Sequence, residues 1–272
     1  KLVEDAIRGM LEKLDPHSIY ITKSEVKKMN EPLEGSFEGI GVVFQMMEDT
    51  LLVIQTISGG PSEKVGIMAG DRFDMVNDSS IAGVNMQNTD IMKKLRGPKG
   101  TSVRVKVLRR GVKDLIEFKI VRDKIPIFSL DAAYMVDDEI GYIKINRFSS
   151  TTFAEYKTAF EKLKKKGMKS LILDLQDNGG GYMSAAIELA DDFLSGGKML
   201  VYTEGANQLK ETHESTAVGD FESGNLVILV NESSASASEI VSGAIQDWDR
   251  GVIVGRRTFA KGLVQKPVAL PD

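Results

Sequence analysis

The second half of the chain alternates between strand-like and helix-like segments, and this alternation restricts the fold more than any other feature. Short aliphatic runs at 140–145, 171–175 and 226–230 have the length and composition of buried strands. Strands that alternate with helices favour an α/β fold. The same pattern predicts helices at 153–165, 183–194 and 240–248, further strands at 252–254 and 263–268, and a polar loop at 204–224.

Residues 1–34 predict two short helices instead. Apolar residues recur at roughly helical spacing up to Asp15-Pro16. The first helix should end there, because proline disfavours helical backbone in the residue before it. A second short helix is expected after Ser24.

Residues 35–123 predict a compact β-rich domain. Its apolar runs are short and are joined by turns rich in Gly, Pro, Asn and Asp. A stretch of this length can fold as an independent domain. We therefore expect three parts, at 1–34, 35–123 and 124–272. The predicted strands of the β-rich domain lie at 40–46, 51–57 and 103–108, with a helix at 91–95.

Composition excludes several classes of function. Without cysteine there can be no disulfide, thiol catalysis or thiolate metal site, and two histidines, His17 and His213, argue against a histidine-rich metal site. The net charge of −4 gives no reason to expect nucleic acid as a partner. No run reaches the ~20 apolar residues that span a bilayer. The chain starts at Lys1, so we interpret it as a fragment in which a missing signal peptide carries no information.

One serine stands at a position suited to a nucleophile. Residues 231–239, NESSASASE, link a predicted buried strand to a predicted helix. Ser236 would lie at the helix N-terminus, where free amides and the helix dipole favour negative charge. Such a place suits a nucleophile and an oxyanion hole. Ser236 and Glu239 also form an ordinary capping box, and this stretch alone favours that structural interpretation.

A second stretch, residues 258–265, offers a base for that serine. A serine hydroxyl needs a base at neutral pH, and a lysine amine can serve when its surroundings keep it uncharged. Lys261 lies in a mainly apolar stretch, and Gln265 follows four residues later, where its amide could orient the amine. The alternative is a surface lysine in a turn, which is the commoner place for lysine.

Three consecutive glycines follow the predicted strand at 171–175. Gly179, Gly180 and Gly181 would let backbone amides approach a ligand closely before a helix. The run lacks the Gly-Lys-Ser/Thr ending of a phosphate loop and the G-x-G-x-x-G spacing of a dinucleotide site. It therefore indicates either part of an oxyanion hole or a simple tight turn.

A Gly-Ile-Gly sequence opens the β-rich domain. Backbone amides around Gly39, Ile40, Gly41 and Val42 can form a nest that captures a carboxylate. A peptide could then pair with the edge of the adjacent strand. By itself this pattern is weak, and a β-turn is the simpler interpretation.

Together these stretches resemble the C-terminal processing (tail-specific) proteases of serine peptidase family S41. Residues 14–20, LDPHSIY, are similar to the family's L-D-P-x-S-x-Y, and residues 39–71 resemble its PDZ domain. Residues 174–181, DLQDNGGG, resemble D-L-R-x-N-x-G-G. Residues 234–239 resemble S-A-S-A-S-E, and residues 258–265 resemble T-F-G-K-G-x-V-Q. The motifs follow the family's order along nearly the whole chain.

The resemblance implies a role for individual residues. Ser236 would be the nucleophile, Lys261 the general base and Gln265 the residue that orients it. Gly39, Ile40, Gly41 and Val42 would bind the substrate's terminal carboxylate. The oxyanion hole would be formed by the N–H group of Ala237 with that of Gly180 or Gly181.

The resemblance also implies a fold, a reaction and a location. The fold would be an α/β core of the crotonase and ClpP type, with an attached PDZ domain and an N-terminal helical segment. The enzyme would be a serine endopeptidase that cleaves proteins at or near unstructured C-termini, after the PDZ domain captures the tail. It would need no cofactor or metal and would work outside the cytoplasm, in the periplasm or cell envelope. A homo-oligomer is left open.

Two positions depart from the family motifs. Gln176 replaces an arginine, which would remove a charge-assisted contact near the oxyanion loop. Ala260 replaces the glycine before the lysine, and its Cβ would displace Lys261 if φ is positive. We also expect the core to be truncated at its C-terminal end, with a strand missing.

Two rival functions follow from the same residues. The first is a catalytically impaired, PDZ-containing scaffold that binds peptides without cleaving them. The second is a crotonase-type acyl-CoA enzyme, since that fold also uses glycine amides as an oxyanion hole. The second rival would explain neither a PDZ module nor the pairing of Ser236 with Lys261.

Overall fold

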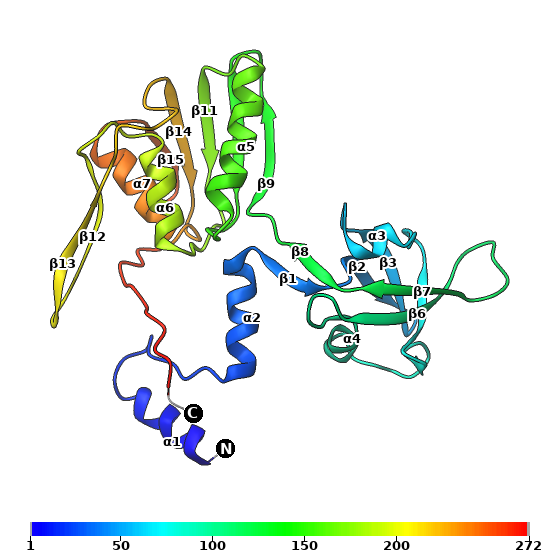
Figure 1. Ribbon diagram of the computed structural model, residues 1–272. Coiled ribbons are helices and arrows are strands. Elements are labelled where there is room, and N and C mark those ends of the chain that lie inside the picture. Colours follow the sequence, from blue (N-terminus) through cyan, green and yellow to red (C-terminus); the bar gives the residue numbers. More distant parts are fainter. Residues whose placement is uncertain (1, 271–272) are drawn as a thin grey trace. The chain divides into compact units, whose positions relative to one another are not determined.

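The computed structural model describes residues 2–270, except for the side chain of Ser24. It divides the chain into two compact units (Figure 1). One unit is Ser36–Ile127, and the other combines the N-terminal segment up to Gly35 with the chain from Phe128 onward. The N-terminal segment thus belongs to the same unit as the α/β part, although the whole other unit separates the two in sequence.

The Ser36–Ile127 unit is built on an antiparallel sheet around its own apolar core. Alternate residues of its strands are buried, such as Val103, Val105 and Val107 in one strand. The three strands and the helix predicted here are confirmed, with shifted bounds. The sheet contains β2 (Val42–Met47), β3 (Thr50–Thr56), β4 (Arg72–Val76), β5 (Ser79–Ser80), β6 (Ser102–Leu108) and β7 (Ile116–Val121), and the remaining elements are α3 (Pro61–Lys64), α4 (Asn88–Leu95) and the antiparallel pair β1 (Ser36–Gly39) and β8 (Asp123–Pro126).

The main sheet of the other unit has five strands. They are β9 (Leu130–Met135), β10 (Ile140–Ile145), β11 (Ser170–Asp174), β14 (Asn225–Val230) and β15 (Val252–Gly255). Their order is β15-β14-β11-β10-β9, in which β9 is an antiparallel edge strand and the other four are parallel. The alternation predicted from residue 140 is therefore confirmed.

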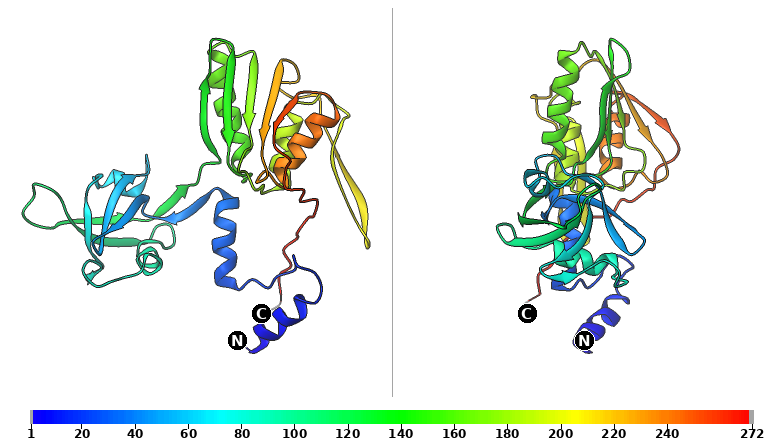
Figure 2. Two further views of the ribbon diagram at one scale, coloured as in Figure 1. Left: turned by 180° about the vertical axis from the view of Figure 1, so that it is seen from behind. Right: turned by 90° about the vertical axis from the view of Figure 1, so that its right-hand side faces the viewer.

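Three helices cover one face of this sheet (Figure 2). They are α5 (Thr152–Lys165), α6 (Met183–Asp191) and α7 (Ala237–Asp247). Aliphatic residues of β10, β11 and β14 are buried together with the apolar side of these helices. The chain crosses from strand to helix at the same end of the parallel strands, and this places the loops after β11 and β14 beside each other.

The N-terminal segment forms the two predicted helices, α1 (Leu2–Leu11) and α2 (Lys23–Glu34). The end of α2 is tied to the loop before α5, because Ser150 donates its N–H to the carbonyl of Leu33 at 2.8 Å and its hydroxyl to that of Glu34 at 3.0 Å. Gly35 follows with φ 69°, and a Cβ there would lie 2.5 Å from Thr151 Oγ1. Among residues 2–270, no helix is both long and apolar enough to cross a membrane.

Two predictions for the second half are wrong. Part of the predicted loop at 204–224 is strand β13 (Gln208–Glu214), which forms a hairpin with β12 (Met199–Gly205). The hairpin is largely exposed, so it lacks the apolar alternation that marks a strand in sequence. The predicted strand at 263–268 is absent, because within the described part of the chain no strand pairs with it and its apolar residues stay exposed.

Candidate catalytic site

Ser236 lies in a strained turn between β14 and α7. Its backbone has φ 55° and ψ −112°, a region that L-residues seldom occupy and that costs about 1–3 kcal/mol. Ser236 is partly exposed, whereas the two residues on either side of it are buried. The expected capping contact of Glu239 is present, since its Oε2 accepts the Ser236 N–H at 2.8 Å. The turn therefore presents Ser236 to solvent directly at the N-terminus of α7.

The neighbouring serines have structural contacts instead. Ser234 is fully buried, and its hydroxyl donates to the carbonyl of Leu175 at 2.7 Å. Ser238 is also fully buried, and its hydroxyl donates to the carbonyl of Asn178 at 2.8 Å. Both contacts bind the turn of Ser236 to the loop that follows β11, so these serines cannot serve as nucleophiles without breaking that link.

The glycine loop after β11 packs directly against this turn. A Cβ built on Gly180, which has φ 98°, would lie 2.9 Å from Ser236 Cβ and 3.0 Å from the backbone nitrogen of Ala237. A Cβ on Gly181 would lie 1.9 Å from the carbonyl oxygen of Phe148. Only glycine allows both approaches. The predicted proximity of the triple-glycine run to Ser236 is thus present in the structure.

The backbone donors near Ser236 differ in their availability. The Gly180 N–H already donates to Asn178 Oδ1 at 2.9 Å. Within residues 2–270, the N–H groups of Ala237 and Gly181 have no hydrogen-bond acceptor. Of the two glycines considered for the oxyanion hole, Gly181 therefore has the available donor. The sequence could not distinguish them, because the difference depends on how the Asn178 side chain points.

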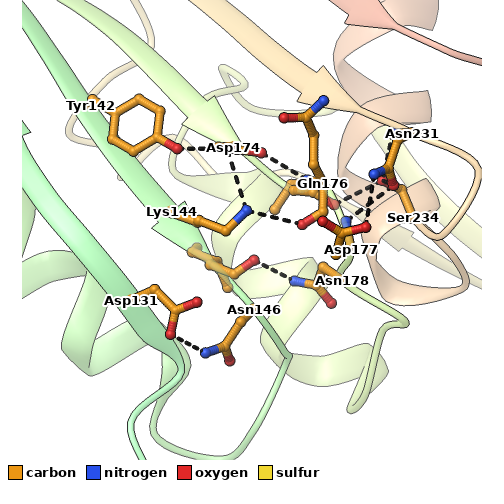
Figure 3. Close-up of polar contacts among 12 residues, drawn as sticks. Asp131, Tyr142, Lys144, Asn146, Asp174, Gln176, Asp177, Asn178, Asn231 and Ser234 are labelled. Atoms are coloured by element: carbon orange, nitrogen blue, oxygen red, sulfur yellow. Dashed lines mark hydrogen bonds and ion pairs between the residues drawn. The ribbon is translucent and has the colours of Figure 1, made fainter.

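Polar side chains hold the glycine loop to the two flanking strands (Figure 3). Asn178 donates its side-chain amide to the carbonyl of Ile145 at 2.9 Å. Asn231 and Asp177 exchange two hydrogen bonds: the Asp177 N–H donates to Asn231 Oδ1 at 3.0 Å, and Asn231 Nδ2 donates to Asp177 Oδ1 at 2.9 Å. The loop is thereby fixed from β10 on one side and from the Ser236 turn on the other.

A lysine supplies positive charge beside the loop where the family motif has arginine. Lys144 Nζ donates to the carbonyl of Gln176 at 3.2 Å and lies 3.4 Å from Asp174 Oδ2 (Figure 3). Tyr142 donates to the same carboxylate at 2.5 Å. Burial and this hydrogen bond raise the pKa of Tyr142, so the phenol stays protonated. Lys144 was not among the residues predicted from the sequence, where its only signal is its place near the end of a predicted buried strand.

Glu239 also binds the loop that carries the candidate base. Its Oε1 accepts the Thr258 hydroxyl and the Ala260 N–H, both at 2.7 Å, and its Oε2 accepts the Lys261 N–H at 2.9 Å. Burial alone would raise the pKa of the Glu239 carboxyl, but these hydrogen bonds and that from Ser236 outweigh it and lower the pKa. From the sequence, Glu239 was predicted only to be part of a helix cap.

The side chains of the proposed catalytic residues are only partly assembled. Lys261 Nζ donates to Gln265 Oε1 at 3.2 Å, as expected of an orienting residue. In the described part of the chain, no hydrogen bond joins the side chains of Ser236 and Lys261. The flanking apolar residues are not buried themselves, since Phe259 is 65% exposed and Leu263 and Val264 are each 55% exposed.

Ala260, the residue before the lysine, has φ 70°. Because this φ is positive, the Cβ of Ala260 strains the loop that carries Lys261. The left-handed conformation costs an L-residue about 1–2 kcal/mol relative to glycine. The two N–H groups that follow one another at Ala260 and Lys261 both point at the Glu239 carboxylate, and this pairing offsets the strain.

The candidate carboxylate-binding loop lies at the edge of the antiparallel sheet. Gly39 ends β1, Val42 begins β2, and Gly41 between them has φ 73°. The carbonyl of Ile40 accepts both the N–H and the hydroxyl of Ser62, at 3.0 and 2.7 Å, which fixes the loop. β2 is an edge strand that pairs only with β3 among the described strands. Its free edge is available for an added peptide strand.

Comparison with known proteins identifies both units. The model of peptidase family S41 matches residues 139–272, and a PDZ domain model matches residues 39–120. The chain is 35% identical to a carboxy-terminal-processing protease of Bartonella bacilliformis, over 100% of this chain and 63% of that protein. It is 38% identical to the carboxy-terminal processing protease CtpA of Bacillus subtilis, over 97% of this chain and 56% of that protein.

A solved structure agrees with these relatives. The photosystem II D1 C-terminal processing protease is 29% identical, with a TM-score of 0.55 over 98% of this chain and 73% of that protein. The chain spans less than two thirds of the length of the two curated relatives. By its motifs, its fold and these matches, the chain belongs to peptidase family S41 and carries a PDZ domain.

Proposed function

We propose that this protein is a serine endopeptidase that cleaves protein substrates at or near unstructured C-termini, with Ser236 as its nucleophile. One observation carries the proposal: Ser236 is a partly exposed residue with strained backbone in a strand-to-helix turn, and the backbone of Gly180 packs directly against it. Nucleophilic serines occupy turns of this kind because the strain projects the hydroxyl and frees the amides of the following helix.

The proposed reaction proceeds through an acyl-enzyme. Ser236 Oγ attacks the scissile carbonyl while its proton passes to the uncharged amine of Lys261. The oxyanion accepts hydrogen bonds from the N–H groups of Ala237 and Gly181. The C–N bond then breaks, and the leaving amine takes the proton from Lys261. Water attacks the ester by the same route, which releases the new carboxyl terminus and restores the serine.

Lys261 must approach Ser236 for this reaction. Catalytic hydrogen bonds are often long without substrate and tighten when it binds. Both residues already donate their backbone N–H groups to Glu239, so one carboxylate holds the backbone of both. Gln265 accepts a hydrogen bond from the amine and would guide that approach.

Covalent labelling tests the nucleophile. Wild-type protein should react with a fluorophosphonate probe and degrade β-casein, which is unfolded, whereas Ser236→Ala should do neither. Ser233→Ala is the matched control, because Ser233 is an exposed serine three residues earlier. Lys261→Arg should also be inactive, since arginine stays protonated. Normal turnover by Ser236→Ala, or labelling of another serine, would contradict the assignment.

The second part of the proposal is that the PDZ domain captures the substrate tail. Amides around Gly39, Ile40, Gly41 and Val42 would hold the terminal carboxylate while the tail pairs with the edge of β2. The inactive Ser236→Ala chain should bind an apolar-ended peptide acid more tightly than the same peptide with an amidated C-terminus. Equal affinities would remove tail recognition from the proposal and leave the peptidase assignment standing.

A non-catalytic peptide-binding scaffold is the second candidate. The observation that favours it is the missing hydrogen bond between the Ser236 and Lys261 side chains within residues 2–270. The two candidates differ in the labelling experiment, because a scaffold binds the peptide acid but does not react with the fluorophosphonate. Fluorophosphonate labelling of Ser236 together with release of a cleaved peptide would exclude the scaffold.

The proposal extends to fold type and location. Four parallel strands, helices on one face and a glycine loop beside Ser236 support a core of the crotonase and ClpP type; a crystal structure with another strand order would contradict this. The family resemblance supports a location outside the cytoplasm, in the periplasm or cell envelope. Cell fractionation should then recover it in the envelope or periplasmic fraction, and recovery in the cytoplasm would overturn this point.

A further inference from the structure

The N-terminal turn of residues 15–18 contacts the site from the opposite end of the chain. Gln265 Nε2 donates to the carbonyl oxygen of His17 at 2.9 Å, across a sequence separation of 248 residues. Figure 1 shows the red C-terminal segment running beside the blue N-terminal segment. The other end of the same amide, Gln265 Oε1, accepts the hydrogen bond from Lys261 Nζ at 3.2 Å. His17, Gln265 and Lys261 therefore form one hydrogen-bonded chain.

The His17 contact decides which way the Gln265 amide faces. A carbonyl oxygen can only accept a hydrogen bond, so it pairs with the NH₂ end of the amide and turns Oε1 toward Lys261. In the flipped orientation the NH₂ group would donate to the lone pair of the uncharged amine. That lone pair must remain available for the proton of Ser236. The orientation seen here leaves it available, because the amine donates to Oε1 instead.

The position of the His17 carbonyl is itself set by Asp15. Asp15 Oδ1 accepts the N–H groups of His17 and Ser18 at 2.7 and 2.8 Å, and Oδ2 accepts the Ser18 hydroxyl at 2.6 Å. Hydrogen bonds from the Ser18 side chain and the His17 backbone lower the pKa of the Asp15 carboxyl, which keeps it an acceptor at neutral pH. Pro16 restricts the backbone between them.

Contacts lie on both sides of this turn, one within the N-terminal segment and one to the loop before α5. On one side the Arg8 guanidinium of α1 lies 5.7 Å from the centre of the Tyr20 ring. On the other side Ser150 binds the last carbonyls of α2. The turn therefore has fixed neighbours and is more than a connection between two helices.

We propose that the turn of Asp15 to Ser18 is a positioning element for the catalytic lysine: Asp15 holds the His17 carbonyl, which orients the Gln265 amide, which orients Lys261. This gives a role to the L-D-P-x-S-x-Y stretch, and it rests on the proposed peptidase function. Asp15 acts only through other residues and touches neither the substrate nor the reacting atoms.

Substitutions at Asp15 test the element. Asp15→Ala should slow fluorophosphonate labelling and β-casein turnover by about tenfold, the effect of losing roughly one net hydrogen bond. Asp15→Asn should recover most of the rate, because its amide oxygen can still accept both backbone N–H groups. Glu12→Ala removes an exposed carboxylate three residues earlier and should change nothing. Equal rates for Asp15→Ala and wild type would overturn the proposal.

A double-mutant cycle separates positioning from general destabilisation. In the Gln265→Ala background, Asp15→Ala should cause no further loss, because the residue through which it acts is absent. Losses that multiply would show that Asp15 acts by another route and would overturn the proposal, while the peptidase assignment would stand. Thermal unfolding of each variant shows whether any loss of rate follows from loss of fold.

A readout without activity keeps the test independent of the proposed function. The side-chain NH₂ resonances of Gln265 in a ¹H–¹⁵N spectrum should shift in Asp15→Ala and stay in place in Glu12→Ala. Unchanged resonances in Asp15→Ala would refute the positioning contact even if the wild-type chain proved inactive. If the Gln265 resonances shift in Asp15→Ala but the wild-type chain is neither labelled nor active, the peptidase function is refuted instead.

Discussion

Ser236 and Lys261 donate their backbone N–H groups to the same oxygen atom, Oε2 of Glu239, at 2.8 and 2.9 Å. The other oxygen of this carboxylate accepts the Thr258 hydroxyl and the Ala260 N–H. One side chain therefore joins the nucleophile's turn to the loop that carries the base. Such shared anchoring fixes the backbone of both residues before substrate binds, so that less ordering remains for the reaction itself.

Replacing Glu239 with glutamine should separate the two segments. Glutamine keeps one acceptor oxygen, but its NH₂ group would face two donors. We expect the free energy of unfolding to fall by about 1 kcal/mol, because partly buried donors lose their acceptor, and fluorophosphonate labelling to slow by more than tenfold. Urea unfolding and labelling rates measure both. Glu188→Gln, on the exposed side of α6, is the control and should leave both values unchanged.

Acid should weaken the same contact in the wild-type protein. The folded pKa of Glu239 lies below the usual 4.5 of an unfolded chain. The unfolded state then binds more protons in this range, so the stability from Glu239 is fully present above pH ~4.5 and is lost as the pH falls through the lowered folded pKa. Urea unfolding from pH 7 to 3 should show a smaller decline in Glu239→Gln than in wild type. Parallel declines would contradict the shifted pKa.

Glycine at position 260 should stabilise the loop that carries Lys261. Ala260 has φ 70°, and removing its Cβ relieves strain that exceeds the extra entropy of glycine in the unfolded chain. We expect Ala260→Gly to raise the free energy of unfolding by about 0.5–1 kcal/mol. Ala217→Gly provides the comparison, because Ala217 is exposed and is absent from the residues with positive φ, so glycine there should destabilise. If both variants destabilise equally, Ala260 carries no strain.

A methyl group at Gly180 should disrupt the site. A Cβ there would lie 2.8 Å from the carbonyl oxygen of Ala235 and 2.9 Å from Ser236 Cβ, both closer than atoms can pack. Gly180→Ala should therefore displace the loop or the serine and reduce turnover by about 10²-fold, the scale of losing one oxyanion donor. Gly179→Ala should be tolerated, because nothing lies within 4 Å of a Cβ at that position. Similar rates for the two variants would contradict the close approach.

The buried serines beside Ser236 should affect stability. Removing the hydroxyl of Ser234 or Ser238 leaves the carbonyl of Leu175 or Asn178 without that donor. We expect each alanine variant to lose about 0.5–1.5 kcal/mol of unfolding free energy, the net value of one hydrogen bond, whereas Ser236→Ala should lose activity with little loss of stability. Chemical denaturation followed by far-UV circular dichroism measures this contrast. A stable but inactive Ser234→Ala would require a different nucleophile.

Local sequence patterns were enough to predict the alternation of strands and helices and to identify the candidate residues. The strand at 140–145 and the helix at 153–165 follow from local periodicity, which reports the buried face of an element wherever that element packs on one core. The stretch at 263–268 has the composition of a strand but no pairing partner among the described residues, and the hairpin strand at 208–214 has a partner but no buried face. Composition alone cannot report either condition.

The connections between the candidate residues, in contrast, depend on the tertiary fold. Parallel pairing of β11 with β14 brings Asn178 to the serine turn, where it takes up the Gly180 N–H and leaves that of Gly181 available. The tertiary fold also lets Glu239, which caps α7, bind the loop that carries Lys261. It brings the His17 carbonyl within hydrogen-bond distance of Gln265. These contacts depend on the directions of side chains from distant segments, and the local pattern of a sequence carries no record of those directions.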